Sequence, residues 1–164
     1  MKVLVLGYGN VSRCDDGVGW FVAEELRKRP LPGVEVQTVH QLDIDLAETI
    51  HHFDVVIFVD AAVPQNPHAV TRTVVAPDLQ SNAIVHSLRP ADLLGLAISL
   101  FGRSPRGLLF SIRGCNFDFG MELSAPTEEA ARIVVEKITE LTDLLQRNAT
   151  EAGNLWMESS SSMR

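Results

Sequence analysis

Short runs of apolar residues alternate along this chain with longer segments in which apolar residues recur every three or four positions. The runs at 3–6 and 55–59 are continuously apolar, which is typical of strands covered on both faces, as in parallel sheets. Segment 34–39 alternates, segment 70–75 is β-branched and expected near a sheet edge, and the short apolar segment 108–112 is a further strand candidate. The pattern therefore predicts five strands.

Helical spacing marks the segments between these strands and one segment after the last. Apolar residues follow a period near 3.6 in 16–29, 43–51 and 90–101, and in a final helix that begins near Ser124 or Thr127. Alternating strands and helices are typical of an α/β domain. We expect a three-layer α/β/α arrangement.

The 164-residue chain is 46% hydrophobic, which is enough apolar material for one core. Residues 1–148 are expected to form a single α/β domain. Residues 149–164 contain four consecutive serines and no periodic apolar face, and they are expected to be a disordered tail.

Charge and cysteine content exclude several classes of function. The formal charge of −7 and the absence of a basic run argue against nucleic acid as a partner. The apolar run near the start is too short for a signal peptide or a membrane span, so we expect a cytoplasmic protein that binds no membrane. Cys14 and Cys115 lie far apart in sequence and suggest neither a disulfide framework nor a thiolate zinc site.

Three side chains with metal-ligating chemistry stand near predicted strand ends. Asp16 follows the first strand, Asp60 ends the third, and His86 lies in a loop before the third helix. Ligands bind outside the carboxyl ends of parallel strands, and two oxygens with one nitrogen suit Zn²⁺ or Ni²⁺. Two of these residues have structural alternatives, since Asp16 could cap a helix and His86 could be an ordinary hydrogen-bonded histidine. A carboxylate that closes an apolar strand, such as Asp60, usually must be paired or ligated.

The glycines of Gly7-Tyr-Gly-Asn10 raise the possibility of a dinucleotide site. However, Ser12 occupies the position of the third glycine in that motif, and two carboxylates follow where a phosphate would lie. A Rossmann-like nucleotide-binding protein is therefore the weaker alternative.

Taken together, these motifs resemble the hydrogenase maturation proteases. The pattern Gly-x-Gly-Asn, four residues, Asp-Asp/Glu-Gly-x-Gly is complete at 7–19, and Asp60, the segment around His86 and the Gly-x-x-Phe-x-x-Gly-x-x-Leu-Ser pattern at 114–124 follow in order. The resemblance implies a five-stranded, mostly parallel mixed sheet with helices on both faces. It also implies that Asp16, Asp60 and His86 are the metal-binding and catalytic residues.

The resemblance further implies an endopeptidase that recognises nickel in the large-subunit precursor of a nickel-iron hydrogenase and removes its C-terminal extension. The nickel would arrive with the precursor, although other divalent ions can occupy such a site in vitro. The metal could polarise the scissile carbonyl or activate water, or it could position the substrate while an aspartate acts as base. A monomer is expected, and a nickel-dependent checkpoint module without cleavage activity is the alternative from another class.

One segment departs from the commoner family pattern. Many members have Asp-Gly-Gly-Thr after the second strand, where this chain has Val39-His-Gln-Leu42. The His-Gln-Leu version is similar to the branch that serves NAD-linked bidirectional hydrogenases. His40 and Gln41 are therefore candidates for substrate recognition, with simple closure of a turn as the alternative.

Overall fold

The computed structural model describes residues 1–80, 87–147 and 160–163. Its elements are β1 (Val3–Tyr8), the 3-10 helix η1 (Cys14–Gly17), α1 (Val18–Arg27), β2 (Val34–Val39), α2 (Leu46–Ile50), β3 (Val55–Ala62), β4 (Val70–Val75), α3 (Pro90–Phe101), β5 (Arg106–Arg113), α4 (Ala125–Arg147) and β6 (Ser160–Met163). The strands form one sheet in the order β2-β1-β3-β5-β4-β6.

The five predicted strands are present, and the sheet is mixed and mostly parallel as expected. Strands β2, β1, β3 and β5 are parallel, and β4 is antiparallel to β5. The expected disorder of residues 149–164 is wrong at 160–163, where the backbone of β6 pairs antiparallel with β4. Extended serines can satisfy a sheet edge through backbone hydrogen bonds alone, which an apolar-face criterion does not detect. The remainder of the predicted tail lies outside the described residues.

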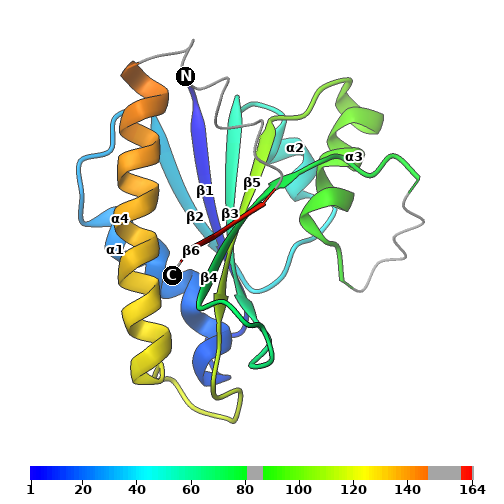
Figure 1. The fold of residues 1–164 in the computed structure, drawn as a ribbon. Coiled ribbons are helices and arrows are strands. Elements are labelled where there is room, and N and C mark those ends of the chain that lie inside the picture. The colour runs from blue at the N-terminus through cyan, green and yellow to red at the C-terminus, as the bar shows by residue number, and fades with distance from the viewer. Residues whose placement is uncertain (81–86, 148–159, 164) are drawn as a thin grey trace.

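Helices cover both faces of the sheet, which confirms the three-layer arrangement. Helices α1 and α4 lie on one face, and α2 and α3 lie on the other (Figure 1). Successive side chains of a strand point to opposite faces, so Val3 and Val5 pack with α1 and α4, whereas Leu4 and Leu6 pack with α2 and α3. All four of these side chains are fully buried, as expected from a continuously apolar strand.

Helix boundaries follow local signals in some places and distant contacts in others. Helix α3 spans the predicted range, with Pro90 in its first turn and Gly102 in the left-handed conformation (φ 76°) at its end. Helix α1 begins at Val18, two residues later than predicted, because residues 14–17 form η1 instead. Helix α2 is shorter than predicted.

The carboxyl ends of the four parallel strands meet at one edge of the sheet, the lower edge in Figure 1. We call it the carboxyl edge. The segment η1 follows β1 at this edge, and Asp60 lies in the last half of β3. No helix within the described ranges is long and apolar enough to cross a bilayer.

Candidate active site

Asp16 and Asp60 lie close together at the carboxyl edge. Strands β1 and β3 are paired in parallel, with Gly7 opposite Val59, and this register carries the end of β1 and the following η1 toward Asp60. The backbone N–H of Asn10 donates to Asp16 Oδ2 at 2.7 Å, and the N–H of Ala61 donates to Asp60 Oδ1 at 2.8 Å. Both carboxylates are half-buried, so each keeps access to solvent or a ligand.

The electrostatics of this pair differ from those of ordinary surface carboxylates. Burial raises the pKa of Asp60 to about 6, and the nearby charge of Asp16 also raises it, while hydrogen bonds from the Ala61 N–H and the Tyr8 hydroxyl partly oppose the rise. Near neutral pH, Asp60 can therefore hold or release a proton. A carboxyl group with this property, next to a second carboxylate, is suited to proton transfer or to metal ligation.

Tyr8 also belongs to this site, although no motif in the sequence marks it as a functional residue. Its hydroxyl hydrogen-bonds to Asp60, and its ring stands edge-on to Phe58 with 6.5 Å between ring centroids. Burial, followed by the negative charge of Asp60, raises the pKa of the Tyr8 hydroxyl, so the phenol stays protonated and donates. In the sequence, Tyr8 is marked only by its position at the end of the first strand, two residues after Leu6 and on the same face.

Asp15 has a different role from its neighbour Asp16. It is fully buried, and its carboxylate accepts hydrogen bonds from the backbone N–H groups of Cys115 (2.7 Å), Asn116 (2.9 Å) and Ser124 (2.7 Å) and from the Ser124 hydroxyl (2.7 Å). The Thr127 hydroxyl lies 3.0 Å away as well. Burial raises the pKa of Asp15, but the hydrogen bonds from Ser124, Cys115 and Asn116 outweigh it and hold the pKa below its usual value. Asp15 therefore fastens η1 to the loop before α4.

The glycines of the first motif allow backbone segments to touch. A β-carbon at Gly7 would lie 2.2 Å from the carbonyl oxygen of Gly19, so β1 and α1 approach more closely than any side chain permits. Gly9 has φ 141°, and a β-carbon there would lie 2.1 Å from the carbonyl oxygen of Asp16. The turn is thus filled by the protein's own backbone, which disfavours the dinucleotide alternative.

The remaining predicted residues have different positions. His40 and Gln41 are exposed just after β2, two strands from β3 at the same edge. His86 lies outside the described residues. Within 1–80, 87–147 and 160–163, no group of three or more His, Cys, Asp or Glu residues is arranged to hold a metal ion. The described part thus contributes two carboxylates to the predicted trio.

The chain flanking residues 81–86 is tied to the start of α3. The guanidinium of Arg89 donates to Asp78 at 2.9 Å and to Asp92 at 2.7 Å. Asp92 also accepts from the backbone N–H of Arg89, and the N–H of Asp78 donates to the carbonyl of Ala91. Asp78 and Arg89 are therefore both fixed to the first turn of α3.

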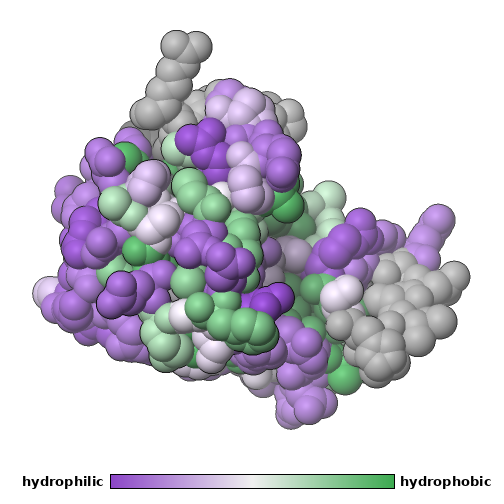
Figure 2. Space-filling view, turned by 90° about the horizontal axis from the view of Figure 1, so that it is seen from below, coloured by the Kyte–Doolittle hydropathy of each residue, from purple (hydrophilic) through white to green (hydrophobic). Residues whose placement is uncertain are grey.

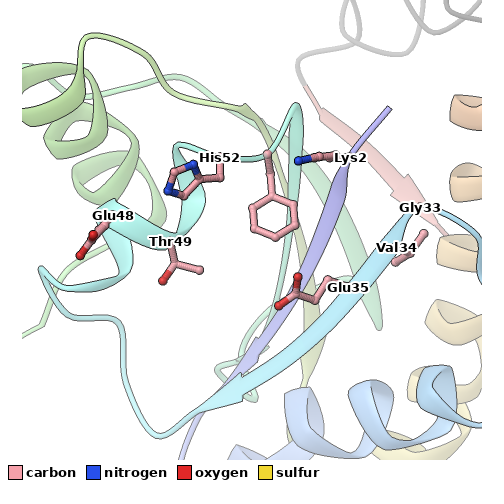
Figure 3. Close-up of a pocket in the computed structure, with 8 residues that line it drawn as sticks. Lys2, Gly33, Val34, Glu35, Glu48, Thr49 and His52 are labelled. Atoms are coloured by element: carbon pink, nitrogen blue, oxygen red, sulfur yellow. The ribbon is translucent and has the colours of Figure 1, made fainter.

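Two cavities differ in their relation to these residues. A cavity of about 690 Å³ lies at the opposite edge of the sheet, and residues including Lys2, Glu35, Glu48 and His52 line it (Figure 3). None of the predicted site residues contributes to it. A smaller cavity of about 470 Å³ lies at the carboxyl edge, and it is lined by Cys14, Asn116, Gly120, Met121, Glu122, Leu123 and Ser124. The smaller cavity adjoins η1 through Cys14, and its lining includes Asn116 and Ser124, which donate hydrogen bonds to Asp15.

Comparison with known proteins identifies the fold. No protein-family model and no curated protein matches the chain. Among solved structures, the NiFe hydrogenase maturation protease HycI from Thermococcus kodakarensis is 22% identical, with a TM-score of 0.69 over 87% of this chain and 92% of that one. HybD from the same organism is 24% identical, with a TM-score of 0.68 over 87% and 99%. The hydrogenase maturating endopeptidase HybD from E. coli is 22% identical, with a TM-score of 0.69 over 89% and 93%. The chain therefore has the α/β fold of these structures.

Proposed function

We propose that this protein is a hydrogenase maturation endopeptidase. It hydrolyses one peptide bond near the C-terminus of the large-subunit precursor of a nickel-iron hydrogenase and releases the C-terminal extension. The observation that carries the proposal is the pair formed by Asp16 and Asp60 at the carboxyl edge, with the pKa of Asp60 raised to about 6. The fold shared with structures described as hydrogenase maturation proteases supports it.

The chemistry assigned to Asp16, Asp60 and Tyr8 follows from their surroundings, and that assigned to His86 follows from its residue type and the family resemblance. Asp16 and Asp60 supply carboxylate oxygens to the nickel that the precursor carries, and His86 supplies an imidazole nitrogen. The nickel of the substrate, when held by these residues, would supply Lewis-acid chemistry that polarises the scissile carbonyl. Tyr8 fixes the orientation of Asp60 through its hydroxyl.

The finer features of the proposal concern the precursor and the setting. His40 and Gln41 flank the approach to the carboxyl edge from the β2 side, where they contact the precursor. Their His-Gln-Leu context favours the precursor of an NAD-linked bidirectional hydrogenase. We further propose that the protein acts as a cytoplasmic monomer.

The test is cleavage of purified precursor. Nickel-loaded and nickel-free precursors are incubated with the protein, and the released C-terminal peptide is detected by mass spectrometry. We expect cleavage of the nickel-loaded form alone, and its loss in Asp16→Asn, Asp60→Asn and His86→Ala. Asp143→Asn, an exposed carboxylate on α4, is the matched control. Precursor that is bound but never shortened would point to a checkpoint module instead.

A further inference from the structure

Large apolar side chains are exposed at the carboxyl edge. Phe119 is 85% exposed, Met121 is 73% exposed and Val63 is 63% exposed. Single exposed apolar residues are ordinary, but a group of them beside a cavity marks an interaction site. Figure 2, which views the molecule from this edge, shows hydrophobic side chains gathered between hydrophilic ones.

The loop that carries Phe119 and Met121 is firmly held. The N–H of Cys14 donates to the carbonyl of Gly120, and the N–H of Gly120 donates to the carbonyl of Ser12, both at 2.9 Å. The buried carboxylate of Asp15 binds three further backbone N–H groups of the same loop. A surface fixed before binding loses little conformational entropy when a partner arrives.

Arg13 completes this surface. Its guanidinium lies over the ring of Phe119, 4.6 Å from the centroid, and the residue is exposed. No acidic partner of Arg13 is seen in the described part of the chain. Its positive charge is therefore available to a carboxylate on another molecule, while its stacked face adds to the apolar surface.

The surface is continuous with the candidate active site. The N–H of Asp16 donates to the carbonyl of Arg13 at 3.1 Å, so Arg13 and Asp16 belong to the same turn. The cavity of about 470 Å³ is lined by Met121 and Leu123 from the loop and by Cys14 from η1. A protein whose terminal segment reaches Asp16 must cover this neighbouring surface.

We propose that Arg13, Phe119, Met121 and the adjoining cavity form a docking platform for the folded body of the hydrogenase precursor. This inference rests on the proposed function. The partner surface is apolar, with one side chain entering the cavity and a carboxylate facing Arg13. Aromatic residues, Met and Arg are the residue types enriched in protein interfaces, and aromatic and Arg residues dominate their binding energy. The platform selects the precursor by contacts outside the scissile bond.

The experiment measures KM and kcat on nickel-loaded precursor. The double variant Phe119→Ala/Met121→Ala is compared with Leu100→Ala/Ile133→Ala, which removes two exposed apolar side chains from α3 and α4. We expect KM to rise by about tenfold or more in the first variant, with kcat changed less than about twofold. Phe119→Trp keeps an aromatic ring under Arg13 and should stay near the wild-type KM. Circular dichroism checks that each variant is folded.

Binding of the precursor, measured by titration calorimetry, separates this inference from the proposed function. If the wild type binds the precursor without cutting it and the double variant loses binding, docking is upheld and the protease function is not. An unchanged KM and affinity in the double variant would overturn the docking platform. Sedimentation showing a wild-type dimer that the double variant abolishes would also overturn it, because the occupant would be a second copy of the chain.

Discussion

Replacing Asp15 by Ala should destabilise the protein far more than replacing any exposed carboxylate of the same edge. Three backbone N–H groups, those of Cys115, Asn116 and Ser124, converge on this carboxylate within 2.9 Å. A hydrogen bond to a charged group contributes about 1.5–3 kcal/mol, and the value falls toward 1 where water can replace the acceptor. Cys115 and Asn116 are exposed, so we expect a total loss of about 4 kcal/mol.

The assay is urea unfolding at pH 7, with thermal unfolding in parallel. At this chain length, a loss of about 4 kcal/mol lowers Tm by about 8–16 °C. Asp15→Asn keeps the shape but turns an amide nitrogen toward backbone donors, and it should lose about 2 kcal/mol or more. Asp118→Asn, an exposed residue of the same loop, should change the free energy of unfolding by less than about 0.5 kcal/mol.

Acid titration gives a second measurement of the same interaction. The pKa of Asp15 is lowered in the folded protein, so its contribution is present above the unfolded value of about 3.9 and is lost as pH falls through the folded pKa. The variants should lack this part of the acid destabilisation. A loss below about 1 kcal/mol in Asp15→Ala, or no difference from Asp118→Asn, would refute the role given to the hydrogen bonds.

Three further predictions concern the carboxylate pair and the glycine turn. Tyr8→Phe removes a hydrogen bond to ionised Asp60 and should raise the pKa of Asp60 above about 6. Asp16→Asn removes a like charge and should lower the pKa of Asp60. Carboxyl ¹³C NMR titration measures both shifts. The pKa of Asp60 is higher in the folded protein than in the unfolded chain, so the free energy of unfolding falls as pH rises from about 4 through 6. Asp60→Asn cannot ionise and should therefore stabilise the protein at pH 7 by about 2 kcal/mol, as measured by urea unfolding. Gly7→Ala forces a β-carbon against Gly19 and should destabilise by about 3 kcal/mol or prevent soluble expression.

Each of these has a clear contrary result. A shift of the Asp60 pKa in the same direction in Tyr8→Phe and Asp16→Asn would mean that the Tyr8 hydroxyl and the Asp16 charge do not act as described. A protein that loses stability at pH 7 on Asp60→Asn would show that the ionised carboxylate is a net stabilising group. A Gly7→Ala variant with the wild-type free energy of unfolding would show that β1 and α1 can move apart without loss of stability.

Much of the fold could be predicted because its signals are local. The continuous apolar runs of β1 and β3 identify strands buried on both faces, and Pro90 with Gly102 sets the limits of α3. The division between Asp15 and Asp16 could not be predicted, because the partners of Asp15 lie about a hundred positions away. The same distant contacts hold residues 14–17 in a 3-10 turn, which explains the late start of α1.

Tyr8 was missed for a related reason. Alternation along β1 places its side chain on the face of α2 and α3, which describes an ordinary partly buried aromatic residue. Only the register of β1 against β3 brings its hydroxyl to Asp60. Strand register is a property of the assembled sheet, and a strand-by-strand pattern does not contain it.

If the proposed function holds, the adjacent aspartates predict a difference that a genetic selection for active hydrogenase can detect. Position 15 is constrained by folding, so mutations elsewhere that raise global stability should suppress the defects of Asp15 variants. Position 16 is constrained by what its oxygens contact at the carboxyl edge, and no such suppressor should restore an Asp16 variant. Two neighbouring residues of the same type are thus subject to separate selective pressures, and second-site suppression can tell them apart.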